Sequence, residues 1–249
     1  MTPELEILIE KLKWLRLPGM VQSIAQILDQ AATNGWTPLE VVSRLADEEK
    51  NSRFSNAVKT RIKAAQFPEL NTVDAFDFEF DAQRKKMRAR YLRLMDLAFL
   101  EQGTNPIFMG NPGTGKTFLA RALAFKACSS NKRVLFISAP KMLNHLAASE
   151  MHGQLERALR RYVTPHLLVI DDFAVLAMDG AQAKLAFQVI SERYDHKLST
   201  SITTNRPFSE WAKVFPDPLN AQLVAERLAQ RTEVILMEGK SYRTAPPVR

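Results

Sequence analysis

The sequence has almost nothing that would place it in a membrane or an oxidising compartment. It contains one cysteine in 249 residues, which excludes an intramolecular disulfide and favours a reducing environment. We expect that residue, Cys128, to be a small buried side chain. No apolar stretch approaches the length of a membrane-spanning helix, and the acidic segment 1–10 does not resemble an export signal. These absences predict a cytoplasmic protein without a membrane partner.

Several kinds of catalytic site are also absent. The four histidines show no metal-ligand spacing, and the single cysteine adds no further ligand. There is no G-x-S-x-G nucleophile motif. Neither an internal repeat nor a low-complexity tract is present. Zinc sites and α/β-hydrolase chemistry are therefore not expected.

The net charge of +7 is distributed unevenly along the chain. Residues 1–80 carry 9 Lys and Arg against 12 Asp and Glu, a net of −3. Residues 81–249 carry 25 against 15, a net of +10. The basic part therefore predicts a polyanionic partner for the second half of the chain.

Residues 110–117 read G-x-x-x-x-G-K-T, a pattern typical of a phosphate-binding loop. A short apolar run at 106–109 precedes it and an apolar helical run at 118–127 follows, which is the strand–loop–helix context that the motif requires. Glycines let backbone N–H groups turn toward phosphate oxygens, and the helix N-terminus adds its dipole. We expect a nucleoside triphosphate, with Lys116 at the β- and γ-phosphates and Thr117 on Mg²⁺. The expected nucleotide-binding residues are Gly110, Asn111, Pro112, Gly113, Thr114, Gly115, Lys116, Thr117 and Phe118.

A second element accompanies the loop. Residues 167–172 read L-L-V-I-D-D, an apolar run that fits a central parallel strand. Its terminal carboxylates would lie where ligands bind in open α/β sheets. We predict that Asp171 holds the Mg²⁺ shell and Asp172 orients or deprotonates the attacking water. Taken alone, the segment fits a strand ending in a solvated turn equally well. Its distance from Lys116 leaves room for a helix, a strand and another helix, which favours the first interpretation.

Residues 1–70 are predicted to form a small helical domain. A helix begins after Thr2, the sequence Leu17-Pro18-Gly19 breaks it, and a second helix ends near Gly35. Thr37 and Glu40 form a capping box that begins a helical stretch toward residue 65, with a break expected at 51–55.

Residues 71–82 are predicted to be an extended linker. Phe76, Phe78 and Phe80 alternate with acidic residues, a period of two. We expect these rings to anchor the linker on the following domain near the base of the nucleotide, although a plain edge strand would show the same pattern.

The remainder, 83–249, is predicted to be an α/β domain. Residues 83–101 fit one amphipathic helix, with Arg84, Lys85, Lys86, Arg88, Arg90 and Arg93 opposite an apolar face. Strand runs follow at 107–109, 134–137, 167–170, 200–204 and 234–237, with helical segments between them. This alternation predicts a five-stranded parallel sheet with helices on both faces.

With these motifs and the strand end at 201–206 (S-I-T-T-N-R), the chain resembles an AAA+ ATPase. More narrowly, it is similar to the IstB-type ATPases, the helper proteins of bacterial insertion sequences, which are relatives of the DnaC helicase loaders. The resemblance spans nearly the whole chain. Its further features are L-R-L-P-G-M at 15–20, A-Q-F-P at 65–68, F-D-F at 76–78, D-D-F at 171–173, T-N-R-P at 204–207 and S-Y-R at 241–243.

The resemblance implies ATP and Mg²⁺ as ligands and an ATPase activity. Asn205 corresponds to the first sensor, which touches the γ-phosphate or the attacking water. Many AAA+ proteins have a helical lid after the last strand, but only the short segment 238–249 follows Met237, so no C-terminal lid is expected. The usual glutamate after the metal-binding aspartate is replaced by Asp172, whose shorter side chain predicts slow hydrolysis, stimulated by assembly or by DNA.

AAA+ ATPases complete their sites between subunits with an arginine from the neighbour. Arg227 is the first candidate for that arginine, followed by Arg231 and Arg193. The alternative for Arg227 is a solvated helix face with an intrahelical acidic partner. This implication predicts an ATP-dependent oligomer.

The connection from 139 to 165 is predicted to bind DNA phosphates through Lys141, Arg157, Arg160 and Arg161. In initiators and loaders an extra helix at this place faces nucleic acid. A solubilising helix face is the alternative, and the basic run at 84–93 can equally cover a sheet edge. We expect largely sequence-independent contacts with duplex DNA.

Three functions are compatible with these features. The first is a transposition helper that assembles on duplex DNA and activates a transposase. A replicative helicase loader would share the same machinery but prefer single-stranded DNA. A small-molecule kinase would share the loop, but the basic second half and the first-sensor strand argue against it. The acidic helical domain at 1–70 fits docking to a protein partner or to DNA.

Overall fold

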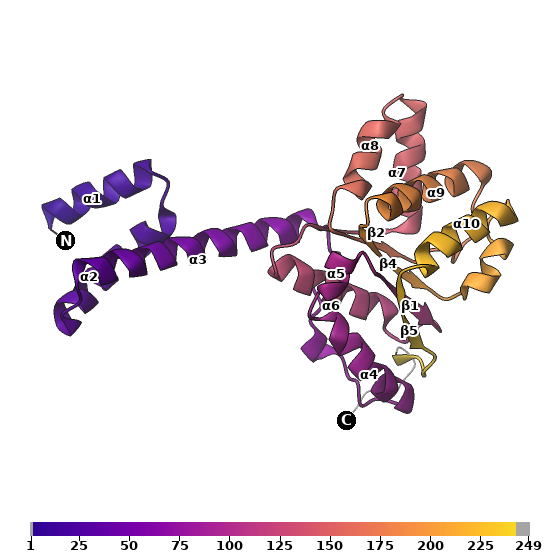
Figure 1. The fold of residues 1–249 in the computed structure, drawn as a ribbon, viewed down its shortest axis with the longest axis horizontal. Coiled ribbons are helices and arrows are strands. Elements are labelled where there is room, and N and C mark those ends of the chain that lie inside the picture. Colours follow the sequence, from indigo (N-terminus) through magenta and orange to yellow (C-terminus); the bar gives the residue numbers. More distant parts are fainter. Residues whose placement is uncertain (1, 243–249) are drawn as a thin grey trace. The chain divides into compact units, whose positions relative to one another are not determined.

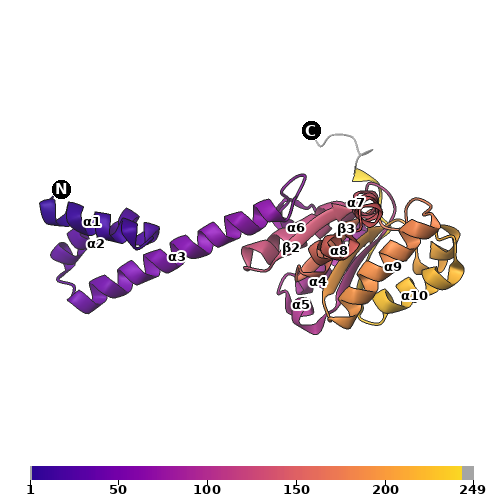
Figure 2. The same cartoon turned by 90° about the horizontal axis from the view of Figure 1, so that it is seen from above.

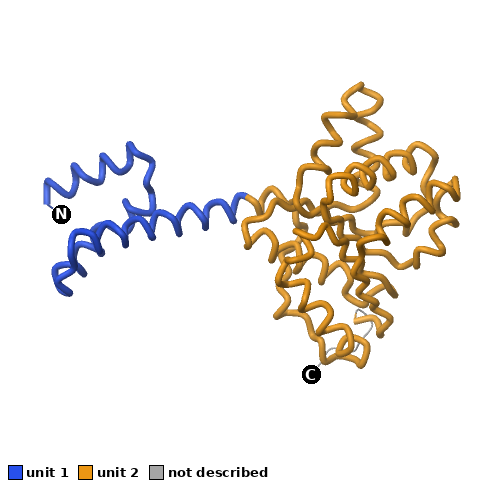
Figure 3. The backbone as a smooth tube through the Cα atoms, viewed as in Figure 1, with its two compact units in different colours: residues 1–60 blue, residues 61–249 orange. Residues whose placement is uncertain are grey.

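A computed structural model describes residues 2–242, which form two compact units (Figure 3). The first unit is residues 1–60 and the second is residues 61–249. Arg243, the last residue of the S-Y-R motif, lies outside the described residues.

The first unit is helical, as predicted. It contains α1 (Pro3–Trp14), α2 (Pro18–Asn34) and most of α3 (Pro38–Ala64). Thr2 caps α1, and Gly35 ends α2 in a left-handed conformation with φ of 65°. The predicted capping box is present, since the Glu40 carboxylate accepts from the Thr37 N–H at 2.7 Å and the Thr37 hydroxyl accepts from the Glu40 N–H at 3.3 Å.

The break predicted at 51–55 is wrong. Helix α3 runs without interruption from Pro38 to Ala64. No glycine or proline lies between 39 and 64, and polar residues such as Asn51 and Ser52 weaken a helix too little to end it.

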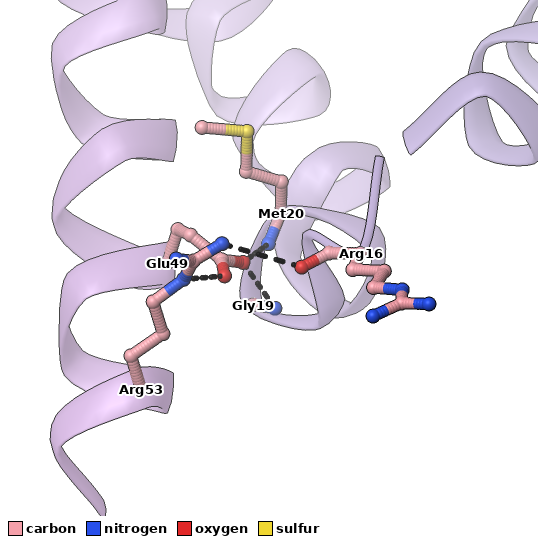
Figure 4. A network of polar contacts seen from close by, with 5 residues as sticks. All are labelled: Arg16, Gly19, Met20, Glu49 and Arg53. Atoms are coloured by element: carbon pink, nitrogen blue, oxygen red, sulfur yellow. Dashed lines mark hydrogen bonds and ion pairs between the residues drawn. The ribbon is translucent and has the colours of Figure 1, made fainter. Parts of the chain in front are cut away.

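The start of α2 packs against α3 through a buried carboxylate (Figure 4). The Glu49 Oε2 atom accepts from the N–H groups of Gly19, at 2.8 Å, and Met20, at 3.3 Å. Arg53 donates through Nε to Glu49 Oε1 at 2.7 Å and through Nη2 to the Arg16 carbonyl at 3.3 Å. A Cβ on Gly19 would lie 2.6 Å from the Glu49 Cα atom, so only glycine allows this approach. The L-P-G-M sequence therefore specifies a contact between α2 and α3 as well as the break between α1 and α2.

The second unit contains a five-stranded parallel sheet with the order β2-β3-β4-β1-β5. This confirms the predicted fold class. The strands are β1 (Asn105–Gly110), β2 (Val134–Ser138), β3 (Leu167–Asp171), β4 (Ser199–Thr204) and β5 (Thr232–Met237). All five run in the same direction, so the residues that follow β1, β3 and β4 gather at one edge of the sheet.

Helices cover both faces of this sheet (Figures 1 and 2). One face carries α4 (Ala82–Leu94), α5 (Ala98–Gln102) and α6 (Lys116–Ser129). The other carries α7 (Ala139–Met151), α8 (Leu155–Val163), α9 (Gly180–Asp195) and α10 (Pro218–Ala229). Two short 3₁₀ helices, η1 (Val73–Ala75) and η2 (Phe208–Lys213), complete the elements of this unit.

Each face has its own hydrophobic core. Leu119 and Leu123 of α6 pack on the first face with Phe108 and Val169, and Cys128 is fully buried among them. Burial raises the pKa of the Cys128 thiol to about 12, which agrees with the expected inert small residue. The second face buries side chains of α7, α9 and α10, including Met142, Val189 and Val224.

The segment predicted as an extended linker contains the single turn of η1 followed by irregular turns, and no strand forms among residues 71–82. Phe76 and Phe78 are buried in the α6 face of the sheet. The single helix predicted at 83–101 is also wrong, because Leu97 adopts a left-handed φ of 66° and separates α4 from α5. In the described part of the chain, no helix is long and apolar enough to span a bilayer.

Candidate nucleotide-binding site

The loop between β1 and α6 has the backbone that its glycines allow. Gly110, Gly113 and Gly115 have φ values of 145°, 77° and 99°, which side-chain-bearing residues rarely adopt. A Cβ on Gly110 would lie 2.1 Å from the Met237 carbonyl oxygen, and one on Gly115 would lie 2.6 Å from the Phe76 ring. The loop is thus enclosed on both sides by other segments, and only glycine fits at these positions.

The side chains of Lys116 and Thr117 lie at the start of α6. The Lys116 ammonium donates to the carbonyl oxygens of Gly110 and Asn111, both at 2.8 Å, and the residue is 8% exposed. The Thr117 hydroxyl donates to Asp171 Oδ1 at 2.8 Å. The loop and the end of β3 are therefore in direct contact, as the two sequence motifs predict.

Asp171 is buried at the end of β3 and receives a second hydroxyl, that of Thr203 on β4, at 2.6 Å. The Thr203 hydroxyl also accepts from the Asp172 N–H at 2.9 Å. Asp172 adopts a left-handed φ of 56°, so the chain leaves the strand geometry directly after Asp171. We did not identify Thr203 from the sequence, although a threonine in a buried strand beside the predicted sensor is a usable signal.

Asn205 is exposed at the tip of β4. It lines the same cleft as Lys116, Thr117, Asp171 and Asp172, a cleft with a volume of about 590 Å³. Five of the predicted site residues therefore converge. Gly113, Gly115, Pro112 and Phe118 also line the cleft, whereas Gly110, Asn111 and Thr114 contribute to the loop behind it.

Segment 69–84 forms the far wall of the cleft. Glu69, Asn71, Phe76 and Arg84 line it there. The Phe76 ring lies 5.6 Å from the Phe118 ring, so the phenylalanine-rich segment packs on the helix that follows the phosphate loop. The cleft accordingly has a polar end at Asp171 and an aromatic end at Phe76.

Arg84 differs most from its sequence-based assignment. The expectation of an exposed basic face is wrong for this residue, which is 5% exposed, because Arg84 lies at helical spacing before Met87 and Tyr91 on the buried side of α4. Its guanidinium lies over the rings of Phe76 and Phe80, each at 4.6 Å, and this cation–π contact offsets part of the cost of burial. Desolvation lowers the pKa of Arg84, and the nearby charges of Asp81 and Asp77 oppose this shift. The rest of the run, such as Lys85 and Arg88, is exposed as predicted.

Arg227 lies away from this cleft. Its guanidinium packs over the Phe187 ring of α9 at 4.6 Å. The end of α10 is joined to the start of β1, where Asn105 Nδ2 donates to the Leu228 carbonyl at 3.2 Å. The phosphate loop follows the other end of β1, about 17 Å along the strand at the usual rise per residue. Arg227 and Arg231, which packs over Tyr194, therefore lie away from the phosphate loop of their own chain.

Arg193 cannot be the arginine that completes the site of a neighbouring subunit. It is fully buried, and it donates to the Thr200 hydroxyl and to the carbonyl oxygens of Tyr162, Pro165 and Ser199. These acceptors belong to the segments around β3 and β4, so Arg193 joins them from within the core. Arg193 follows Val189 and Ile190 at helical spacing, so the apolar pattern of α9 was a usable signal that this arginine is buried.

The four predicted DNA-contacting residues lie on α7 and α8. Lys141, Arg157 and Arg160 are exposed, and Arg160 pairs with Glu156 at 3.3 Å. Arg161 is partly buried and donates to Gln66 Oε1 at 2.6 Å. Ala158, Leu159 and Tyr162 bury the opposite side of α8. Helix α8 is strongly amphipathic, with its basic side in solvent.

Comparisons with known proteins agree with this geometry. The family described as "IstB-like ATP binding protein" matches residues 10–246. A protein named as an ATP-binding protein of insertion sequence IS232, from Bacillus thuringiensis subsp. berliner, is 34% identical over 95% of this chain and 93% of its own. One named for insertion sequence IS21, from Pseudomonas aeruginosa, is 34% identical over 96% of this chain and 88% of its own.

The fold is shared with a solved structure. The crystal structure of the DnaC helicase loader superposes with a TM-score of 0.57 at 21% identity, covering 75% of this chain and 99% of that one. At this identity the likeness concerns the fold alone.

Proposed function

Because the chain belongs to the family of IstB-like ATP binding proteins, we propose that it is an insertion-sequence ATPase that assembles on duplex DNA and assists a transposase. The observation that carries the proposal is the convergence of Lys116, Thr117, Asp171 and Asn205 on one cleft. A phosphate loop, a strand-end carboxylate and a polar sensor are the groups that bind and hydrolyse a nucleoside triphosphate.

In this proposal the phosphates of ATP lie along the loop from Gly110 to Thr117. Lys116 would leave the carbonyl oxygens of Gly110 and Asn111, to which it now donates at 2.8 Å, and bind the β- and γ-phosphates. Asn205 would contact the γ-phosphate or the attacking water, because it lines the cleft at the tip of β4. Phosphate oxygens are stronger acceptors than backbone carbonyls, so the exchange at Lys116 favours binding.

The residues at the end of β3 fit a magnesium ion. Thr117 and Asp171 already place a hydroxyl and a carboxylate oxygen 2.8 Å apart, and hard oxygen ligands of this kind are those that Mg²⁺ binds. When bound, the ion would neutralise charge on the β- and γ-phosphate oxygens. The Thr203 hydroxyl fixes the orientation of Asp171 from β4. Asp172 would orient the attacking water, and its short side chain supports slow turnover.

We propose that hydrolysis needs a second subunit. Arg227 lies far along β1 from its own phosphate loop, and the Phe187 ring holds its guanidinium in place without neutralising it. An arginine in this state suits the phosphates of a neighbouring chain. ATP would thereby control assembly, and assembly would control hydrolysis.

The surface of α7 and α8 is the proposed DNA contact. Lys141, Arg157 and Arg160 are exposed there, and the second half of the chain carries a net charge of +10. Cations on these two helices would bind phosphates without reading bases, so binding would be largely independent of sequence. The helical unit at 1–60 would dock a partner, the transposase being the proposed one.

A DNA-binding measurement tests this proposal directly. Fluorescence anisotropy of a labelled random duplex is recorded during titration with the protein in ATP·Mg²⁺, and then in ADP·Mg²⁺, with unlabelled single strand as competitor. Tight ATP-dependent binding that single strand cannot displace is expected, and stimulation of the transposase is then assayed. Absence of binding to either form of DNA would overturn the proposal.

The second candidate is a helicase loader, because the fold is shared with the DnaC helicase loader. The two functions differ in the preferred DNA. Preference for single strand in the same titration would favour the loader.

A further inference from the structure

Arg84 is buried beside the phosphate loop, at the wall of the cleft, and touches three separate segments of the chain. Its Nη2 atom donates to the Thr114 carbonyl at 3.3 Å, and Nη1 donates to the Asp77 carbonyl at 3.0 Å. Its guanidinium also lies over the Tyr242 ring at 5.1 Å. One side chain thus joins the phosphate loop, the segment before α4 and the segment after β5.

The same segments also contact one another around the loop. The Tyr242 N–H donates to the Gly113 carbonyl at 2.9 Å. The Phe76 ring lies so close to Gly115 that a Cβ there would be 2.6 Å away. Phe76 and Phe78 pack edge to face with their centroids 4.8 Å apart, and Phe80 packs in the same way on Tyr242 at 5.1 Å. A layer of aromatic rings therefore packs against the loop, and the Arg84 guanidinium lies among these rings.

The contacts anchor two successive peptide groups of the loop by their carbonyls. In a trans peptide the C=O and N–H bonds point in opposite directions. Holding the Gly113 and Thr114 carbonyls from outside therefore turns the N–H groups of Thr114 and Gly115 the other way. Arrays of such N–H groups are what bind phosphate oxygens in loops of this kind.

If Arg84 had only a structural role, burying its charge would lower the stability of the fold. Among the described residues no carboxylate lies within ion-pair distance of Arg84, and its Nε is buried without a hydrogen-bond partner. A buried charge with incomplete compensation destabilises the unliganded fold relative to an apolar side chain of similar size. A role in ligand binding would account for its presence.

We propose that Arg84 is a positioning residue for the phosphate loop, which it holds with the Thr114 and Gly115 N–H groups directed at the phosphates of the nucleotide. The inference rests on the proposed function in taking a nucleoside triphosphate as the ligand. If the packing of segment 76–81 against α4 raises the affinity for the nucleotide, the bound nucleotide must stabilise that packing in turn. Because the coupling is reciprocal, the two effects are of the same size.

The test compares Arg84→Met, Arg84→Lys and Arg93→Met in the full chain. Arg93 lies on the same helix but is exposed, so it is a matched control for removal of a cation. The dissociation constant for ATP in Mg²⁺ is measured by displacement of a fluorescent ATP analogue. The melting temperature without nucleotide is recorded for each variant. Hydrogen exchange of segment 73–81 is followed with and without ATP.

We expect Arg84→Met to weaken ATP binding at least ten-fold. Arg84→Lys keeps the charge but loses the planar guanidinium with its several N–H donors, so it should weaken binding less. Arg93→Met should bind as the wild type does. The melting temperature of Arg84→Met without nucleotide should be unchanged or raised, which a structural role would not produce. ATP should slow hydrogen exchange in segment 73–81 of the wild type but not of Arg84→Met.

Unchanged ATP affinity in Arg84→Met would overturn the inference. A fall in melting temperature that accompanies the loss of affinity would also overturn it, because the arginine would then be structural. If Arg84→Met does not fold, the same two criteria apply to Arg84→Lys. Failure of the wild type to bind ATP would instead overturn the proposed function.

Discussion

The Thr203 hydroxyl on β4 donates to Asp171 Oδ1 at 2.6 Å, so β4 is bonded directly to the carboxylate at the end of β3. The same hydroxyl accepts from the N–H of Asp172 at 2.9 Å. Replacing Thr203 with valine keeps the volume and removes both bonds. The Asp172 N–H would lose its partner, which costs about 1–3 kcal/mol. We expect ATP turnover to fall at least ten-fold in a steady-state assay, with a smaller effect on ATP affinity.

Ser201→Ala is the control for that substitution. Ser201 lies two residues earlier on the same strand, and its buried hydroxyl has no hydrogen-bond partner among the described residues. Its removal should leave turnover unchanged and stability equal or slightly higher. Equal losses of turnover in the two variants would show that β4 tolerates no substitution and that Thr203 has no particular role.

Arg227→Ala should retain ATP binding and lose hydrolysis and assembly. The reason is that Arg227 lies away from its own cleft and packs over Phe187. If it acts on the neighbour's phosphates, mixing Arg227→Ala with Lys116→Ala should restore turnover, since each variant supplies the group that the other lacks. ATPase rate and sedimentation velocity measure the two properties. Full activity of Arg227→Ala alone would exclude the assignment, and Arg231 would be tested next.

The double change Arg157→Ala and Arg161→Ala should weaken binding to every duplex by a similar factor. The slope of log K against log salt should become shallower by about 0.9 for each lost phosphate contact. Because Arg161 also donates to Gln66, the single Arg157→Ala variant separates loss of a contact from loss of that bond. Removing two exposed cations elsewhere, Arg93 and Lys126, controls for net charge. An unchanged slope would place the DNA contact on another surface.

Glu49→Gln should loosen the first unit. Burial raises the pKa of Glu49, but the hydrogen bonds from Arg53, Gly19 and Met20 outweigh it and hold the pKa below its usual value of 4.5. A carboxyl with a lowered folded-state pKa stabilises above its unfolded pKa, and that contribution is lost as pH falls through the folded value. Loss of the charge-assisted bonds should cost about 1–3 kcal/mol.

The measurement for Glu49 is hydrogen exchange of the Gly19 and Met20 amides. Their exchange should quicken in Glu49→Gln at neutral pH, and protection in the wild type should decline as the pH falls through the lowered pKa of Glu49, after correction for the intrinsic rate. Glu48→Gln, which changes the exposed neighbour, is the matched control. Equal protection in both variants would contradict the role of Glu49.

The elements with strong local signals were predictable from the sequence. The capping box at Thr37 determines the start of α3 through contacts three residues apart. The five strand runs correspond to the five strands of the sheet because continuous apolar segments are stable only when covered on both faces. The phosphate loop and the Asp171 strand also lie at one edge, since parallel strands bring their ends together.

Residues whose environment depends on distant segments were not predictable. Arg84 and Arg88 are one helical turn apart and chemically identical, yet one is buried beside the loop and the other is exposed. Arg193 likewise joins β3 and β4 from within the core. The spacing of apolar residues places Arg84 and Arg193 on the buried sides of α4 and α9, but it carries no information about which aromatic rings or carbonyls surround each guanidinium.

The sequence by itself determined the ligand class, the fold and the order of the motifs that line the cleft, because each depends on glycines, apolar runs and charges that act over a few neighbouring residues. Only the tertiary structure decided that Thr203 orients Asp171, that Arg84 supports the phosphate loop and that Arg227 lies beyond its own cleft. These relationships join residues that are distant in the sequence. They exist only once the sheet has brought β3, β4 and the segments flanking the loop together.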